Sequence, residues 1–315
     1  MILRVSVDPS IVEIRLLLAE ASVRQVPSLE RVEIPNPNQS ATERLRELQL
    51  ITVAVIGAGK IGDAVAKSIA KSVDVERVLT TRRNPSTRSF QSDKISVLHD
   101  NKKAARESDL IIISVKAGDA KHVLNEIAEF VSDKVVISLM AAVSVKKIEA
   151  AIPNAKVVRA MPNIGATIGE AMTAYTPSHS LSKKDIEQVQ LVLGSFGDYI
   201  EVPENLMDAV TALSGSGPAY IAILIEAMVS AGLKVGIPRD IAFKLVTKTL
   251  TGTADLLSQN KMHPAELRDT VTTPAGTTIA GIYELEKGSL RTSIMNAVEA
   301  ATQAAERVAK KFESE

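Results

Sequence analysis

The sequence predicts a doubly wound α/β domain followed by an all-helical domain. Alternating strand and helix patterns begin at Ile51 and stop at Pro203. Runs that are apolar throughout, such as Leu110–Val115, are typical of strands buried on both faces of a parallel sheet. After Pro203, Ala- and Leu-rich segments have a helical pattern. We therefore expect an N-terminal extension at 1–50, an α/β domain at 51–203 and a helical domain at 204–315.

The extension carries two helical patterns, Ile11–Ala21 and Thr42–Leu48, separated by three prolines. Ser40 and Glu43 have the spacing of a capping box for the second helix. No chemistry can be assigned to this segment. We favour a packing or oligomer-contact role over a regulatory one.

In the α/β domain, the β-branched run Ile51–Ile56 predicts a strand and Lys60–Lys71 the helix after it. Ala120–Val131 and Lys183–Leu193 are further expected helices. The other strand candidates are Arg77–Thr81, Leu110–Val115, Val135–Leu139, Lys156–Met161, Met172–Tyr175 and Asp198–Val202.

The helical domain is expected to contain helices near Leu206–Val235, Arg239–Ser258 and Leu290–Phe312. Their broad apolar faces favour burial against a second subunit, so we expect a dimer. Gly215 and Gly217 interrupt the first of these helical patterns at a cost of about 1 kcal/mol each. A kink or a close helix approach would explain them.

Composition excludes several classes of function. Lys plus Arg equals Asp plus Glu at 37 each, so no excess charge favours nucleic acid or a membrane surface. The absence of cysteine excludes disulfides and thiolate chemistry. No signal-peptide layout or membrane-length apolar run is found, and we expect a cytoplasmic protein. No metal site is expected, and the histidines are interpreted as surface or packing residues; they are His99, His122, His179 and His263.

The first motif is Gly57-Ala-Gly-Lys-Ile-Gly62, which follows a predicted strand and begins a helix. In that context it indicates a dinucleotide site rather than a purely structural turn. Gly57 permits the tight turn, Gly59 lets the backbone approach a pyrophosphate, and Gly62 lets helix and strand pack closely. Lys60 and Ile61 complete the expected phosphate-binding turn.

The end of the second strand reads Leu79-Thr-Thr-Arg-Arg-Asn-Pro85 and has no carboxylate for ribose hydroxyls. Arg82 and Arg83 can hold a 2′-phosphate, assisted by Thr81. The alternative is that both arginines are solvated loop residues. We expect NADPH as cofactor, with NADH as the second choice.

Three later strands end in residues that can contact the nicotinamide side of the cofactor. We expect contacts from Val115, Lys116, Ala141 and Asn163. Taken individually, each of these residues is as consistent with packing or a turn as with a contact to the cofactor.

The segment Arg268–Gly281 contains five threonines, one proline and two glycines, but no histidine, cysteine or glutamate. Such a segment offers no strong base, thiolate or soft metal ligand. It offers hydroxyls and the backbone N–H groups of a helix start, which suit a carboxylate.

Taken together, Gly57–Gly62, Met161–Asn163, Ala212–Tyr220 and Val271–Ile279 resemble pyrroline-5-carboxylate reductases in order and spacing, from about Ile51 to Val308. The resemblance implies reduction of 1-pyrroline-5-carboxylate to L-proline with NAD(P)H, the last step of proline biosynthesis. It also implies an interlocked homodimer, often assembled into larger rings, with substrate sites between subunits.

By this resemblance, Thr278 is the residue that hydrogen-bonds the ring nitrogen of the substrate. We favour a positional role for it over proton transfer, because a hydroxyl is a poor general acid. The resemblance also implies a loop that grips the substrate carboxylate, formed by Val271, Thr273, Gly276 and Thr277.

This chain departs from the family pattern at Ala117, Ile164-Gly165 and Ala275. These departures leave a related cyclic imine acid open as the substrate. Two further functions stay open, a different NADP-linked imine or 2-oxo acid reductase and a non-catalytic nucleotide-binding paralogue. Against the paralogue, Thr273, Thr277 and Thr278 are all present.

Overall fold

The computed structural model describes residues 50–72, 74–82 and 92–314. The helices and capping box expected within 1–49 lie outside the described residues, as does Arg83.

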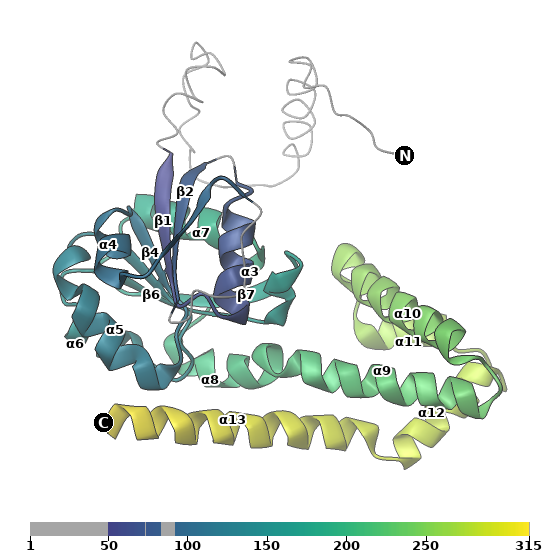
Figure 1. Ribbon diagram of the computed structural model, residues 1–315. Helices are drawn as coiled ribbons and strands as arrows, with labels where there is room; N and C mark the ends of the chain where they lie inside the picture. Colours follow the sequence, from purple (N-terminus) through teal and green to yellow (C-terminus); the bar gives the residue numbers. More distant parts are fainter. Residues whose placement is uncertain (1–49, 73, 83–91, 315) are drawn as a thin grey trace, which may run out of the picture. The chain divides into compact units, whose positions relative to one another are not determined.

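An eight-stranded sheet with the order β3-β2-β1-β4-β5-β6-β7-β8 forms the first domain (Figure 1). All neighbouring strands pair in parallel except β6 and β7, which are antiparallel. The order reverses between β1 and β4, and in such sheets ligands bind at this switch point. The strands are β1 (Ile51–Ile56), β2 (Val75–Thr81), β3 (Ile95–Leu98), β4 (Leu110–Ile113), β5 (Val135–Ser138), β6 (Lys156–Pro162), β7 (Ala171–Pro177) and β8 (Gly197–Glu201).

Two hydrophobic clusters cover the two faces of the sheet. Along β1, Val53 and Val55 belong to the cluster that includes α3 and α7, whereas Ala54 and Ile56 belong to the cluster that includes α4, α5 and α6. The apolar runs are therefore buried on both faces, as predicted. These helices are α3 (Lys60–Ile69), α4 (Asn101–Arg106), α5 (Ala120–Ile127), α6 (Val145–Ala151) and α7 (Lys183–Gly194).

All seven predicted strands are confirmed, with ends that shift by up to two residues. The prediction missed β3, a four-residue strand at the edge of the sheet that has no fully buried side chain. It also missed the short helices α4 and α6. Such short segments carry too few residues for a clear periodicity.

The second domain is helical. The predicted helix 206–235 is divided into α8 (Met207–Val210), a π-helical turn η5 (Thr211–Gly215) and α9 (Gly217–Lys234). A Cβ on Gly215 would lie 3.0 Å from Cε of Met161 on β6, so this glycine lets η5 approach the sheet, whereas a close approach to a second helix was one of the expectations. The remaining helices are α10 (Arg239–Asn260), α11 (Pro264–Thr270), α12 (Thr277–Lys287) and α13 (Leu290–Ser314).

The helical domain buries few of its apolar side chains within one chain. Its small core is formed by Val229, Ala242 and Val246. Large apolar residues such as Ile223, Tyr283 and Met295 are 66%, 68% and 70% exposed. Contrary to the expectation that no apolar run has membrane length, the segment Glu204–Lys234 is long and apolar enough to cross a membrane by length and composition alone, and 11% of its apolar window is buried in this chain. Apolar helix faces left exposed in one chain are typical of surfaces that a second subunit covers.

Ion pairs around the buried side chain of Arg159 join the two domains. Arg159 on β6 is 6% exposed and pairs with Glu204 and Asp208, each at 3.3 Å. Glu204 also accepts a 2.7 Å hydrogen bond from the backbone N–H of Val145, at the start of α6. The carboxyl end of the sheet is thereby tied to the first turns of the helical domain.

Candidate functional site

The glycine turn between β1 and α3 has the geometry of a phosphate-binding turn. Gly57 has a φ of +92°, and a Cβ there would lie 2.5 Å from Cγ1 of Val115. A Cβ on Gly62 would lie 2.5 Å from the carbonyl oxygen of Gly57. A Cβ on Gly59, by contrast, would meet no atom within 4 Å. Two glycines are thus required by packing, whereas Gly59 faces open space.

Helix α3 begins at this turn without a side-chain cap. Gly59 occupies the N-cap position, and its carbonyl accepts the first helical hydrogen bond, from the N–H of Asp63 at 2.8 Å. The N–H groups of Lys60, Ile61 and Gly62 therefore have no partner within the helix and favour an anion. Lys60 is exposed, whereas Ile61 is half-buried against the hydrophobic core.

Hydrogen bonds connect the glycine turn to the end of β2. The backbone N–H groups of Gly57 and Ala58 donate to the carbonyl of Thr81 at 3.2 and 2.8 Å. The Thr81 hydroxyl accepts a further bond from Gly57 N–H at 3.4 Å. Thr81 therefore holds the glycine turn in place, a role that its position in the sequence did not reveal.

Arg82 is not a solvated loop residue. Its guanidinium lies 3.1 Å from the Asp63 carboxylate on α3, and both side chains are more than nine-tenths buried. Arg82 also lines a cavity of about 250 Å³ beside Gly57 and Thr81. This cavity, which we call the β2-end cavity, is lined by Ile56, Gly57, Thr81, Arg82, His99, Asn101, Val115, His122, Val123 and Glu126.

Sequence reasoning missed the polar groups on the far wall of this cavity. His99 and Asn101 follow β3, and His122 and Glu126 project from α5. Asn101 donates to Glu126 at 2.7 Å. Both histidines are exposed, as expected for surface residues, but they lie beside the glycine turn. Nothing in the local sequence pairs them, because β3 itself was not predicted.

The residues predicted for the nicotinamide side lie after β4, β5 and β6. Val115 is half-buried against Gly57, whereas Lys116 and Ala141 are exposed. Asn163 accepts a 3.0 Å bond from Gly165 N–H and donates one of 3.3 Å to the hydroxyl of Ser214 in η5. Asn163 therefore joins the carboxyl edge of the sheet to the π-helical turn.

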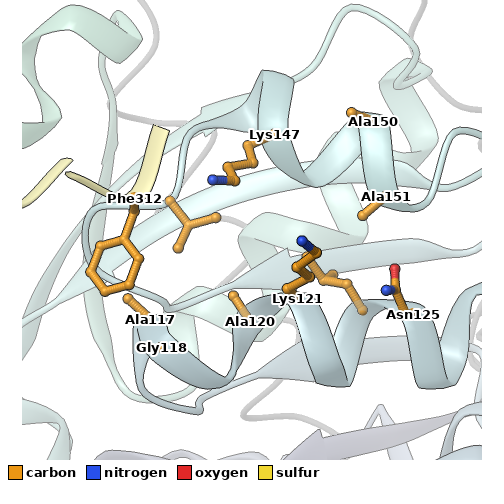
Figure 2. Close-up of a pocket in the computed structure, with 11 residues that line it drawn as sticks. Ala117, Gly118, Ala120, Lys121, Asn125, Lys147, Ala150, Ala151 and Phe312 are labelled. Carbon is orange, nitrogen blue, oxygen red and sulfur yellow. The ribbon is translucent and has the colours of Figure 1, made fainter. Parts of the chain in front are cut away.

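A larger cavity of about 480 Å³ lies between α5 and α6 (Figure 2). Phe312 near the end of α13 closes one side of it. Lys121 and Lys147 reach into it from the two helices. It does not include the glycine turn or the threonine loop.

The threonine loop forms the start of α12. Gly276 is the N-cap residue of this helix and has no side chain to cap it. A Cβ on Gly276 would collide with the Thr273 hydroxyl, so this hydroxyl lies against the helix start. The uncapped N–H groups of the first turn and the Thr273 hydroxyl together suit a carboxylate. Val271, Thr273 and Thr277 are exposed, and Thr278 is half-buried.

One chain does not bring the threonine loop to the glycine turn. Helix α12 packs on α13 and lies at the end of the helical domain remote from the sheet (Figure 1). Phe312, near the other end of α13, touches α5 and α6. From Leu290 to Phe312 the helix rises about 33 Å. A small substrate therefore cannot contact both features within one chain.

Two family models match different parts of this chain. Residues 204–308 match the family model described as pyrroline-5-carboxylate reductase dimerisation. Residues 52–142 match the model described as NADP oxidoreductase coenzyme F420-dependent.

Relatives extend over most of the chain. A pyrroline-5-carboxylate reductase of Synechocystis is 38% identical over 265 residues, covering 83% of this chain and 99% of the relative. One of Methanosarcina acetivorans is 39% identical over 265 residues, covering 82% and 98%. The crystal structure of Plasmodium falciparum pyrroline carboxylate reductase with NADP bound has a TM-score of 0.76 at 31% identity, covering 83% of this chain and 99% of that one.

Proposed function

Because this chain belongs to the pyrroline-5-carboxylate reductase family, we infer that it reduces 1-pyrroline-5-carboxylate to L-proline with a nicotinamide nucleotide as reductant. The observation that carries this inference is that two helix starts, the open Gly59 turn and the start of α12, have no side-chain cap. The first suits a dinucleotide pyrophosphate and the second a substrate carboxylate. A related cyclic imine acid is the less favoured substrate.

The residues at the switch point of the sheet fit a dinucleotide. Pyrophosphate oxygens would approach the N–H groups of Lys60, Ile61 and Gly62 through the space left open at Gly59. The nicotinamide end would lie toward Val115, Lys116, Ala141 and Asn163. When bound, the reduced cofactor supplies the hydride that adds to the imine carbon.

The chain's own part in catalysis is positioning. A cyclic imine is already electrophilic, so alignment of the two reacting carbons contributes more than acid–base chemistry. We place the substrate carboxylate against the start of α12, with Thr273, Gly276 and Thr277 around it and Val271 beside it. Thr278, in the first turn of α12, then orients the ring nitrogen as it becomes an amine.

The substrate site requires two copies of the chain. Since the threonine loop and the glycine turn are too far apart within one chain, the loop of one subunit would meet the sheet edge of its partner. The exposed apolar faces of α9, α10 and α13 supply the contact surface for such a homodimer. Assembly of dimers into a larger ring stays a prediction, as does a cytoplasmic location.

We expect NADPH to be preferred over NADH. No acidic residue follows β2 at Arg82, where an NAD enzyme usually holds the ribose hydroxyls. Arg82 is held by Asp63 beside the β2-end cavity, where a guanidinium can bind the 2′-phosphate. Arg83 remains the second expected phosphate ligand.

The test is nicotinamide absorbance decay with purified protein, pyrroline-5-carboxylate, and NADPH or NADH in parallel. Oxidation of the cofactor with an equal amount of proline formed is the expected result. Replacing Arg82 and Arg83 together with alanine should raise the KM for NADPH far more than that for NADH. Equal effects on both would contradict the 2′-phosphate assignment, and no turnover on any cyclic imine would contradict the reaction.

A further inference from the structure

Ser214 lies where the helical domain meets the carboxyl edge of the sheet, within the π-helical turn η5. Turns of this kind interrupt the regular hydrogen bonds of a helix and occur frequently at functional sites. Gly215 lets the turn come close to Met161 on β6. The hydroxyl of Ser214 thereby reaches Asn163, the residue that directly follows β6.

Two hydrogen bonds fix the side chain of Asn163. Its amide oxygen accepts the 3.0 Å bond from the N–H of Gly165, so its amide nitrogen faces Ser214 and donates to that hydroxyl at 3.3 Å. Gly165 is one of the positions at which this chain departs from the family pattern. A Cβ on Gly165 would collide with the carbonyl oxygen of Glu170, so only a glycine lets the backbone take this path. The oxygen of Ser214 is therefore a hydrogen-bond acceptor in this structure.

The hydroxyl of Ser214 still has a hydrogen to donate, because its bond from Asn163 uses only a lone pair. Helical serines and threonines commonly donate to a carbonyl of the preceding turn. Thr211, in the same turn, does so to the carbonyl of Met207 at 2.8 Å. Ser214 makes no such bond, and no other residue in the described part of the chain accepts one from its hydroxyl. The side chain is half-buried, so this donor is available to a ligand at the sheet edge.

We propose that Ser214 is a further cofactor-binding residue, whose hydroxyl donates a hydrogen bond to the carbonyl oxygen of the nicotinamide carboxamide. This inference rests on the proposed function, which places the nicotinamide toward Asn163. The substrate carboxylate is assigned to the start of α12 and the substrate nitrogen to Thr278, which leaves the carboxamide oxygen as the acceptor at this edge. The carboxamide is attached next to C4, the carbon that carries the hydride. A bond to its oxygen therefore sets the rotation of the ring and the direction in which C4 faces the substrate.

The experiment compares the wild-type protein with Ser214→Ala and with the matched control Ser216→Ala. Ser216 is also half-buried, lies at the end of the same turn and does not cap α9. Each protein is titrated calorimetrically with three nucleotides. They are NADP⁺, thio-NADP⁺, in which a sulfur that accepts hydrogen bonds weakly replaces the carboxamide oxygen, and 2′,5′-ADP, which has no nicotinamide. Thermal unfolding shows that each variant is folded at the temperature of the titration.

The wild type and Ser216→Ala should bind NADP⁺ about two- to tenfold more tightly than thio-NADP⁺, which is the strength of one neutral hydrogen bond. In Ser214→Ala this preference should disappear, while the dissociation constant of 2′,5′-ADP stays at its wild-type value. The same variant should lower kcat with NADPH about two- to tenfold and leave the KM for pyrroline-5-carboxylate unchanged.

Three results would overturn the inference and leave the reductase function intact. The first is a wild type that binds both nucleotides equally, which needs no variant to be measured. The second is a Ser214→Ala protein that keeps the wild-type preference, and the third is one whose only change is a raised KM for pyrroline-5-carboxylate, since the hydroxyl would then contact the substrate. A wild type that binds neither NADP⁺ nor NAD⁺ overturns the inference together with the proposed function.

Discussion

Replacing Gly59 and Gly62 separately with alanine distinguishes cofactor binding from folding within one turn. A Cβ at Gly59 meets no atom within 4 Å, and the φ of −86° is open to alanine. The loss of an N-cap glycine and the gain from a stiffer unfolded chain are each below about 1 kcal/mol. We therefore expect the free energy of unfolding of Gly59→Ala to stay within about 1 kcal/mol of wild type.

The same methyl group occupies the space through which a pyrophosphate must approach α3. Loss of one charge-assisted hydrogen bond costs about 1.5–3 kcal/mol. The dissociation constant for NADP⁺ should then rise roughly ten- to a hundredfold in Gly59→Ala.

Gly62→Ala should behave in the opposite way. Its Cβ would lie 2.5 Å from the Gly57 carbonyl oxygen and 3.3 Å from the Ser114 hydroxyl, so α3 must move away from the sheet. Overpacking of this kind costs about 1–3 kcal/mol. Thermal unfolding and NADP⁺ titration of both variants check the pair. Wild-type NADP⁺ affinity in Gly59→Ala, or equal destabilisation of the two variants, would refute the assignment of Gly59 to the cofactor.

Three further predictions follow from the threonine loop and from α7. Thr278→Val should lower kcat roughly tenfold or more while changing the KM for NADPH less than twofold, because in the proposed site Thr278 contacts the ring nitrogen of the substrate and not the nucleotide. Steady-state kinetics that show a loss confined to NADPH binding would contradict this. Ala275 has a φ of +53°, so Ala275→Gly should raise the free energy of unfolding by about 1 kcal/mol in urea denaturation, and a decrease would show that the loop needs the alanine. Burial alone raises the pKa of Asp185, but hydrogen bonds from Ser182 and Lys156 outweigh it and hold that pKa below its usual range. A carboxyl of this kind stabilises the fold above about pH 4, and this stabilisation is lost as pH falls through the lowered pKa. Asp185→Asn should therefore lower the free energy of unfolding by about 1 kcal/mol at pH 7 and leave it unchanged in strong acid. Equal losses at both pH values would refute the linkage.

The sequence by itself determined the features that depend on neighbouring residues. The strand Ile51–Ile56, the turn Gly57–Gly62 and the helix start after Gly276 follow from local apolar runs and from glycine spacing. Buried strands of a parallel sheet are apolar on both faces, so the sheet could also be predicted. The apolar helices predicted a second subunit because such faces need a partner.

Only the tertiary structure decided which distant residues meet. Arg82 and Asp63 are 19 positions apart, Asn101 and Glu126 are 25 apart, and Asn163 and Ser214 are 51 apart. His99 and His122 come together because the edge strand β3 and helix α5 reach the same end of the sheet. Such pairs depend on strand order and helix packing, which no short sequence window contains. For the same reason, the separation between the threonine loop and the glycine turn depends on the path of a 25-residue helix through space.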